Sequence, residues 1–169
     1  MLVYLVRHGK AEKATAAMRD RDRPLRPRGE RQSEWLAQAL LDGARDRLPA
    51  LILSSEFLRA RETARILSER LGVELRFEQA LELGWPADDA LALVAREAER
   101  GINGPLLLVG HNPQMEILLS ILSPDLAAAD DEMKTGMAAL VDVPDPFDPE
   151  GGGRLLRKLR LNDRSDEQD

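Results

Sequence analysis

The sequence predicts an α/β fold, a three-layer α/β/α sandwich in which helices cover both faces of a mostly parallel, mixed sheet. Short apolar runs alternate along the chain with longer segments whose apolar residues recur at helical spacing, which is typical of a parallel sheet. The last two strand-like runs, 137–143 and 154–161, are joined only by a loop rich in proline and glycine. This final pair adds an antiparallel component to the sheet.

The other predicted strands are also short runs of apolar residues, several of them β-branched or aromatic. They cover residues 2–6, 50–53, 73–77 and 106–109. Apolar runs without polar alternation are typical of strands that are buried on both faces. The first run ends abruptly near Gly9, which predicts a turn at that point.

Four predicted helices separate these strands, and each has one apolar face. The first starts near Pro27, because proline suits the first turn of a helix, and the second covers 57–71 and is capped by Gly72. Asp88 or Asp89 is expected to cap the start of the third helix. The expected buried faces are Leu36, Ala39, Leu40 and Gly43; Ala60, Ala64, Leu67 and Leu71; Leu91, Val94, Ala95 and Ala98; and Met115, Leu118, Leu119 and Leu122.

Length and composition indicate one globular domain over residues 1–161 and a polar, disordered tail over 162–169. No apolar run approaches the ~18 residues of a membrane span, and the N-terminus lacks the pattern of a signal peptide. The chain has no cysteine, which agrees with a cytoplasmic protein. Its net charge of −6 argues against general nucleic-acid binding, which needs a basic face.

The two histidines of the chain, His8 and His111, each directly follow an apolar strand. Parallel strands place their carboxyl ends at one edge of the sheet, where open α/β folds bind ligands. Both imidazoles can therefore face one pocket although they lie far apart in the sequence. A zinc site would need a further ligand, and the chain has no third histidine and no cysteine, so no metal is expected.

Two arginines favour an anion as the ligand of such a pocket. Arg7 directly precedes His8, and Arg59 lies near the start of the helix that follows the second strand. Two guanidiniums, an imidazole and the N–H groups of a helix start can form a phosphate cradle.

The polar stretch 10–25 carries Arg19, Arg21 and Arg23 at alternate positions. Its composition favours a solvated, charged loop. The alternative is a loop that holds arginines over the mouth of the anion site.

Five segments, in this order, resemble the histidine phosphatase superfamily, the phosphoglycerate-mutase-like group. They are Leu5-Val6-Arg7-His8-Gly9; Arg23-Pro24-Leu25 with Gly29; Ser55 through Thr63; Gly110-His111-Asn112-Pro113; and Thr135-Gly136. Within this group the sequence most resembles the SixA-type phosphohistidine phosphatases. The resemblance implies a phosphoglycerate-mutase-like fold, and the chain lacks the extra length of typical mutases, which argues against mutase activity.

The resemblance implies that His8 is the nucleophile. Its neutral imidazole would attack phosphorus in line and form a phosphohistidine that water then cleaves. Arg7, Arg59 and His111 would hold the non-bridging oxygens and stabilise the transferring phosphoryl group, His111 most strongly in its protonated form. No cofactor is implied, and the residues implied on the substrate side are Gly9, Arg23, Thr135 and Gly136.

Superfamily members that cleave phosphate esters use a carboxylate to protonate the leaving alkoxide, and Glu82 and Asp88 are the candidates here. The sequence around Glu82 departs from the pattern of those members, and either carboxylate can instead be a solvated or helix-capping residue. A phosphohistidine substrate relaxes this need. Imidazole, whose conjugate acid has a pKa near ~6.5, leaves readily once its distal nitrogen is protonated.

The sequence therefore predicts a metal-independent phosphohistidine phosphatase that acts on a histidine-phosphorylated signalling or phosphotransfer protein, with no nucleic-acid or membrane partner. Two alternatives stay open: a phosphatase of small phosphate monoesters, and a phosphate-binding module without turnover. A carboxylate on the leaving-group side of His8, from Glu82 or Asp88, would favour the first alternative. The presence of His8 argues against the second.

Overall fold

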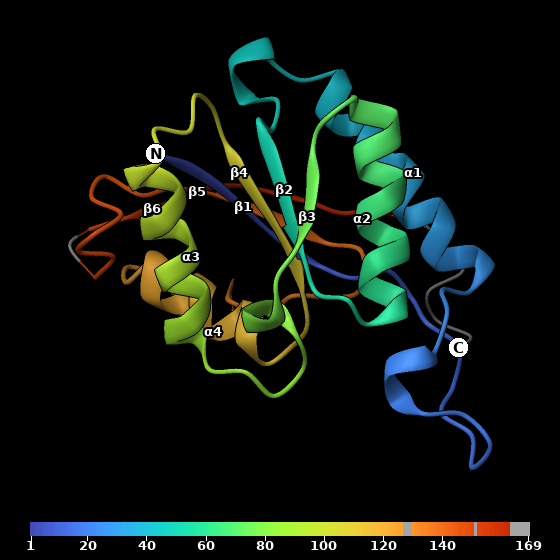
Figure 1. Ribbon diagram of the computed structural model, residues 1–169. Coiled ribbons are helices and arrows are strands. Elements are labelled where there is room, and N and C mark those ends of the chain that lie inside the picture. The colour runs from blue at the N-terminus through green and yellow to red at the C-terminus, as the bar shows by residue number, and fades with distance from the viewer. Residues whose placement is uncertain (127–129, 151, 163–169) are drawn as a thin grey trace.

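A six-stranded sheet forms the centre of the molecule (Figure 1). The structure is a computed structural model that describes residues 1–126, 130–150 and 152–162. The strands lie side by side in the order β3-β2-β4-β1-β5-β6. Residues 163–169, most of the predicted tail, lie outside the described residues. The strands are β1 (Leu2–Arg7), β2 (Leu51–Ser54), β3 (Leu75–Phe77), β4 (Leu106–Gly110), β5 (Ala138–Asp142) and β6 (Arg154–Leu159).

The sheet is mixed, as the sequence predicted. β1, β2, β3 and β4 are parallel, whereas β5 is antiparallel to both of its neighbours, β1 and β6. Arg7 at the end of β1 lies opposite Gly110 at the end of β4, and Ser54 at the end of β2 lies opposite Val109. Three strand ends therefore meet at one edge of the sheet, toward the bottom of Figure 1.

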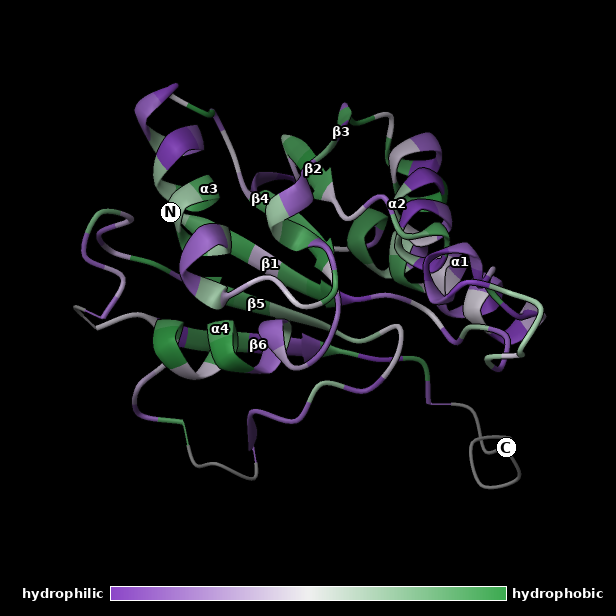
Figure 2. Ribbon diagram, turned by 60° about the horizontal axis from the view of Figure 1, so that its bottom comes forward, coloured by the Kyte–Doolittle hydropathy of each residue, from purple (hydrophilic) through white to green (hydrophobic). Residues whose placement is uncertain are grey.

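Helices cover both faces of this sheet (Figure 2), which confirms the predicted three-layer α/β/α sandwich. Residues of β1 alternate between the layers: Val3 and Leu5 pack toward α3 and α4, and Tyr4 and Val6 pack toward α1 and α2. No helix among the described residues is long and apolar enough to cross a membrane. The helices are α1 (Pro27–Leu41), α2 (Leu58–Leu71), α3 (Ala87–Glu99) and α4 (Gln114–Leu122).

The predicted faces of α2 and α4 pack against the sheet, and Gly72 ends α2 in the left-handed conformation with φ of 67°. The predicted face of α1 is wrong in two positions. The helix buries Ala37 rather than Ala39, and Gly43 lies beyond the end of the helix and is exposed. The α1 face is turned this way because the helix packs against α2 through Leu36, Ala37 and Leu40.

The predicted face of α3 is also wrong, because it left out a buried carboxylate. The helix begins at Ala87, so Asp88 and Asp89 lie in its first turn and neither is its N-cap. Of the predicted face only Val94 is buried, and the observed buried residues are Ala87, Ala90, Leu93, Val94 and Glu97. Periodicity that counts glutamate as polar cannot place Glu97 on the inner side of the helix.

Three arginines neutralise Glu97, whose side chain is 3% exposed. Its carboxylate lies 3.5 Å from Arg76 on β3, 2.8 Å from Arg96 and 3.1 Å from Arg100. Arg96 also pairs with Glu78, which directly follows β3, at 2.5 Å. This network ties α3 to the edge strand β3.

We expect Glu97→Gln to lower the free energy of unfolding by about 1–2 kcal/mol. The loss is smaller than for a fully buried ion pair, because the arginines are partly exposed and water can solvate them again. Urea unfolding measures this loss, and Glu99→Gln on the exposed end of the same helix is the matched control. Equal stability of the two variants would show that the network does not stabilise α3.

Candidate active site

His8 and His111 lie side by side at the carboxyl edge of the sheet. Each directly follows a strand, and because β1 and β4 are parallel neighbours, the ring centroids lie 5.1 Å apart. Ser55 follows β2 at the same edge, and its Oγ lies 2.8 Å from Nε2 of His111. The structure thus brings together the two histidines that the sequence predicted to share one edge.

Main-chain hydrogen bonds hold the backbone of His8 on both sides. Its N–H donates to the carbonyl oxygen of Gly110 at 3.1 Å, and its own carbonyl oxygen accepts from the N–H of Gly136 at 3.0 Å. The N–H of Gly9 donates to Oγ1 of Thr63 at 3.0 Å. Gly136 therefore acts on His8 through the backbone and is not among the residues that line the pocket.

Close packing, rather than a turn conformation, requires the glycine at position 9. A Cβ on Gly9 would lie 2.7 Å from the carbonyl oxygen of Gly29, in the first turn of α1. The φ of Gly9 is not positive, so any side chain would be excluded by this contact and not by backbone strain. Gly9 was predicted to make a turn, and the structure shows instead that it allows α1 to pack closely.

The hydrogen bonds of His8 define the state of its ring. Nδ1 lies 2.7 Å from the carbonyl oxygen of Gly9, which can only accept, so Nδ1 carries the proton. Nε2 is therefore unprotonated, and its lone pair accepts a hydrogen bond from Nε of Arg59 at 3.2 Å. Burial lowers the pKa of His8 to about 3, and the charges of Arg59 and Arg7 contribute to this shift. The imidazole is neutral at pH 7, as a nucleophile needs to be.

His111 is neutral as well. Burial lowers its pKa to about 2, and His8, Arg59 and Arg7 act in the same direction. The protonated form implied by the family resemblance is thus disfavoured in the protein by itself, and a bound anion is needed to raise this pKa.

Arg7 is fixed by the segment that precedes β5. Its Nη1 donates to the carbonyl oxygen of Met133 at 3.0 Å, and Nδ2 of Asn112 donates to the same oxygen at 2.9 Å. Met133 is fully buried, so this carbonyl is a firm support. Nε of Arg7, Nδ1 of His111 and Oδ1 of Asn112 are buried without a partner among the described residues. Arg7 and His111 line the pocket, so each of these two lining residues has a nitrogen without a partner among the described residues.

Asp20, in the short helix η1 (Asp20–Asp22), holds Arg59 from the loop side. Its carboxylate accepts from Nη2 of Arg59 at 3.0 Å and from Nε of Arg23 at 2.9 Å. Its carbonyl oxygen accepts from Nη1 of Arg59 at 2.8 Å. Although burial opposes it, these hydrogen bonds hold the pKa of Asp20 below its usual value. Sequence analysis missed Asp20, since an aspartate between arginines in a polar loop is typical of a solvated surface.

The pocket over this edge has a volume of about 390 Å³ and is strongly cationic. It contains Arg23 and Thr135, which the sequence placed on the substrate side, but not Arg19 or Arg21. Sequence analysis did not single out Lys10, Lys13 or Leu83, although both lysines follow the Arg7-His8-Gly9 motif within a few positions. The lining residues are Arg7, His8, Lys10, Ala11, Lys13, Arg23, Arg59, Leu83, His111, Asn112 and Thr135.

Neither candidate general acid lines the pocket. Glu82 follows the short helix η3 (Gln79–Leu81), and its Oε1 lies 3.9 Å from Nη2 of Arg21. Asp88 is exposed in the first turn of α3. The described residues that line the pocket include no carboxylate. In the part of the chain that the structure describes, no group of three or more His, Cys, Asp or Glu residues could hold a metal ion.

The two low histidine pKa values predict that stability decreases on acidification. Both rings stay neutral in the folded protein down to a pH of about 3, whereas in the unfolded chain they take up protons below about pH 6.5. The free energy of unfolding should therefore fall as pH decreases from 6.5 toward 3, by up to about 1.4 kcal/mol per pH unit for each ring.

Urea unfolding at pH 7, 6 and 5 measures this dependence, and a His8→Asn/His111→Asn variant is the control for titrating carboxylates. NMR signals of the two imidazoles should show no protonation between pH 7 and 5. A titration of either ring near pH 6.5 would contradict the burial argument.

A model of the histidine phosphatase superfamily (branch 1) matches residues 3–83. An uncharacterized protein of Picosynechococcus is 34% identical over 122 residues, which are 68% of this chain and 68% of that protein. An uncharacterized chloroplastic protein of Arabidopsis thaliana is 29% identical over 150 residues, 83% of this chain and 66% of that protein.

Solved structures of two proteins named SixA resemble this chain over nearly its whole length. A structure named as that of a phosphohistidine phosphatase SixA from Agrobacterium tumefaciens is 32% identical, covers 94% of this chain and 96% of its own, and has a TM-score of 0.77. A SixA structure in complex with tungstate has a TM-score of 0.80 at 23% identity, with 95% and 97% covered.

These findings define the class of the protein. It is a phosphatase whose fold places two histidines at the carboxyl edge of a mixed sheet. The chain belongs to the histidine phosphatase superfamily. The resemblance carried by the five sequence motifs is thereby confirmed, and so is the phosphoglycerate-mutase-like fold that it implied.

Proposed function

We propose that this protein is a single-domain, metal-independent phosphohistidine phosphatase that works through a phosphohistidine on His8. One observation carries the proposal: Nε2 of the buried, neutral His8 has its lone pair directed at Arg59, inside a pocket lined by cations and no carboxylate. Such a pocket combines a nucleophile with positive charge for a phosphoryl group. A phosphate-bearing substrate is what this chemistry requires.

The first step transfers the phosphoryl group to the protein. Nε2 of His8 attacks phosphorus, a P–N bond to His8 forms, and the bond from phosphorus to the leaving nitrogen breaks in line. The leaving imidazole takes the electron pair and departs neutral, because its distal nitrogen carries a proton. In the second step water attacks the phosphorus of phospho-His8 and the P–N bond breaks, so that Nε2 regains its electron pair and inorganic phosphate leaves with both protons of the water.

Arg7, Arg59 and His111 are the residues that we assign to the non-bridging oxygens. Nε of Arg7 and Nδ1 of His111 are buried and lack partners among the described residues, so phosphoryl oxygens would satisfy them. The negative charge of the phosphoryl group would raise the pKa of His111 and favour the protonated form that binds it best. Arg23 and Thr135 line the same pocket and contact the rest of the substrate.

The absence of a lining carboxylate favours phosphohistidine over a phosphate ester as the substrate. An alkoxide leaving group needs a proton donor in the pocket, whereas an imidazole leaving group does not. Neither Glu82 nor Asp88 lines the pocket. The relative from Agrobacterium, named as a phosphohistidine phosphatase, supports the same choice.

A protein is the proposed carrier of the phosphohistidine. The pocket is open, and basic side chains that include Lys10 and Lys13 line it, which suits a phosphorylated side chain presented on an acidic surface. Leu83 and Trp85 are 41% and 37% exposed, and Leu83 lies at the pocket, so apolar surface is available there for contact with a partner.

The test is phosphate release from a histidine-phosphorylated carrier protein and from a panel of phosphomonoesters, in the presence of a metal chelator. Fast release from the phosphoprotein alone is the expected result. Faster release from one ester would replace this proposal with a small-molecule phosphatase and make Glu82 the next residue to change. A phosphorylated His8 that accumulates without hydrolysis would indicate a binding module.

A further inference from the structure

A second hollow, of about 240 Å³, lies between α1, β5 and β6, away from the pocket that contains His8. The two pockets share no lining residue. Tyr4 lies at the hollow on β1, four residues before His8, and this separation corresponds to roughly 13 Å of strand. The turn that closes the hollow, η2 (Arg45–Arg47), is at the top of Figure 1, opposite the catalytic edge.

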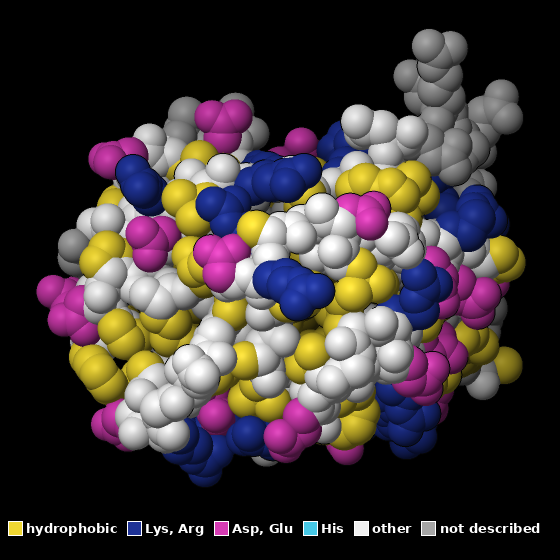
Figure 3. Space-filling model, turned by 90° about the horizontal axis from the view of Figure 1, so that it is seen from above, with side chains coloured by type: hydrophobic (Ala, Val, Ile, Leu, Met, Phe, Trp, Pro, Cys, Tyr) yellow, Lys and Arg dark blue, Asp and Glu magenta, His cyan; other side chains and the backbone are white. Residues whose placement is uncertain are grey.

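The view from above shows this end of the molecule (Figure 3). Lys and Arg side chains are dispersed there among acidic and hydrophobic ones, and neither histidine is visible. A ligand that binds at this end would therefore be separate from the chemistry of His8 and His111.

The inner surface of the hollow is apolar and firmly packed. Tyr4, Leu40, Leu140 and Leu159 all line it and are all buried. The hydroxyl of Tyr4 donates to the carbonyl oxygen of Arg47 at 2.9 Å, which ties the η2 turn over the ring. A cavity of about 150 Å³ can hold benzene, so this hollow has room for one ring or a short chain with a polar group.

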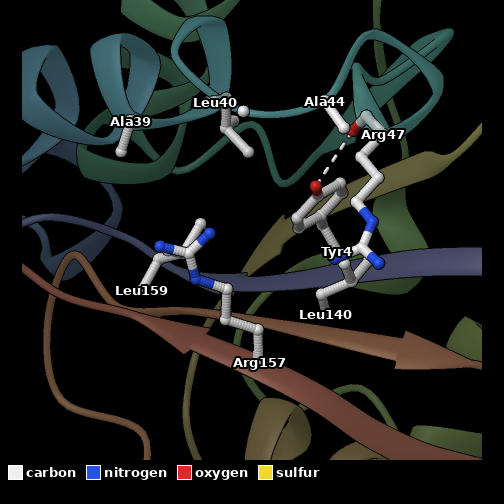
Figure 4. Close-up of a pocket in the computed structure, with 9 residues that line it drawn as sticks. Tyr4, Ala39, Leu40, Ala44, Arg47, Leu140, Arg157 and Leu159 are labelled. Carbon is white, nitrogen blue, oxygen red and sulfur yellow. Dashed lines mark hydrogen bonds between the residues drawn. The ribbon is translucent and has the colours of Figure 1, made fainter.

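Two arginines flank this apolar surface from opposite sides. Arg47 extends from the η2 turn and Arg157 from β6, and the ring of Tyr4 lies between their guanidiniums (Figure 4). Neither guanidinium has a hydrogen bond or an ion pair with a described residue, whereas Arg70 and Arg96, for example, are in close ion pairs. Burial raises the pKa of the Tyr4 hydroxyl, whereas the charges of Arg47 and Arg157 lower it and that of Asp46 raises it.

We propose that this hollow binds a small amphipathic carboxylate. Its apolar part would lie against Leu40, Leu140 and Leu159, and its carboxylate would pair with the guanidinium of Arg47 or Arg157, which flank the Tyr4 ring from opposite sides. Arginine binds carboxylates through paired hydrogen bonds, and an apolar surface next to two guanidiniums that have no partner among the described residues fits a ligand with one apolar end and one anionic end. The ligand class follows from this arrangement of apolar surface and charge.

Benzoate is a suitable probe, and benzyl alcohol is its neutral counterpart of nearly the same shape. Tyr4 is the single tyrosine of the chain, so the NMR signals of a ¹³C-labelled tyrosine ring report on the hollow alone. The imidazole signals of His8 and His111 report on the catalytic pocket in the same sample. Benzoate should shift the Tyr4 signals saturably and bind about tenfold or more tightly than benzyl alcohol.

Arg47→Gln/Arg157→Gln should weaken benzoate binding about tenfold or more, because the arginine that pairs with the carboxylate contributes a charge-assisted hydrogen bond. Arg45→Gln/Arg154→Gln, on the same turn and the same strand but outside the hollow, is the matched control and should leave the affinity unchanged. Equal binding of benzoate and benzyl alcohol would overturn the proposal, and so would unchanged affinity in the first variant. Shifts confined to the two imidazoles would show that the acid binds only in the catalytic pocket.

Discussion

His8→Ala should release phosphate at least about 10³-fold more slowly than the unmodified protein, while it still binds a phosphate-like anion. The variant removes the attacking nitrogen, so no phosphoenzyme can form. Arg7, Arg59 and His111 remain, and they supply the positive charge and the N–H groups that hold the oxygens. Steady-state phosphate release measures the rate, and calorimetry with tungstate measures anion binding.

A rapid-quench experiment with a ³²P-labelled substrate separates the two steps for this residue. The unmodified protein should give an acid-labile, base-stable phosphoenzyme, and His8→Ala should give none. Turnover by His8→Ala at the normal rate would contradict the assignment of the nucleophile. Loss of tungstate binding together with loss of structure would instead show that the variant is misfolded, and His8→Asn would then take its place.

Arg59→Ala should lower kcat/KM by about 10²–10³-fold and should weaken tungstate binding as well. Arg59 is buried, and its Nε lies against the nucleophile, so it is placed to contact the phosphoryl oxygens both before and during transfer. The two variants should differ in a diagnostic way. His8→Ala should lose turnover but still bind tungstate, whereas Arg59→Ala should lose most of both. Kinetics and calorimetry on the two variants measure this difference.

Arg65→Ala is the matched control, because Arg65 lies on the same helix and is exposed. Arg59→Lys should be almost as impaired as Arg59→Ala. A lysine carries the charge, but its single Nζ cannot replace the three separate guanidinium nitrogens that donate to Nε2 of His8, to the carbonyl oxygen of Asp20 and to the Asp20 carboxylate. If Arg59→Ala behaved like Arg65→Ala, the phosphate cradle would need to be built from other residues.

The parts of the fold that the sequence predicts well depend on local rules. The buried run at 2–6 followed by Arg7 and His8 indicates both a strand and the edge at which the strand ends. The same reasoning applies to 106–109 and His111, and the parallel topology then brings the two rings together. Turn chemistry is equally local, as Gly72 illustrates.

What the sequence did not predict depends on long-range contacts. Glu97 is buried because arginines from β3 and α3 surround it, and no periodicity rule contains that information. Asp20 contacts Arg59 because a polar loop folds back over α2, which composition alone argued against. The roles of Glu82 and Asp88 stay predictions, and only kinetics can test them.

The contact between Gly9 and Gly29 has a consequence for how substrate preference can be altered. The backbone around His8 is held by main-chain hydrogen bonds to Gly110 and Gly136, by the Thr63 hydroxyl and by a glycine-to-glycine contact with α1. The segment 83–86 can therefore be exchanged without moving the reactive nitrogen, whereas 10–25 carries Asp20, which holds Arg59 against that nitrogen. Substrate preference is therefore best altered on the side of the pocket that Leu83 lines, because changes on the side of Asp20 would also alter reactivity.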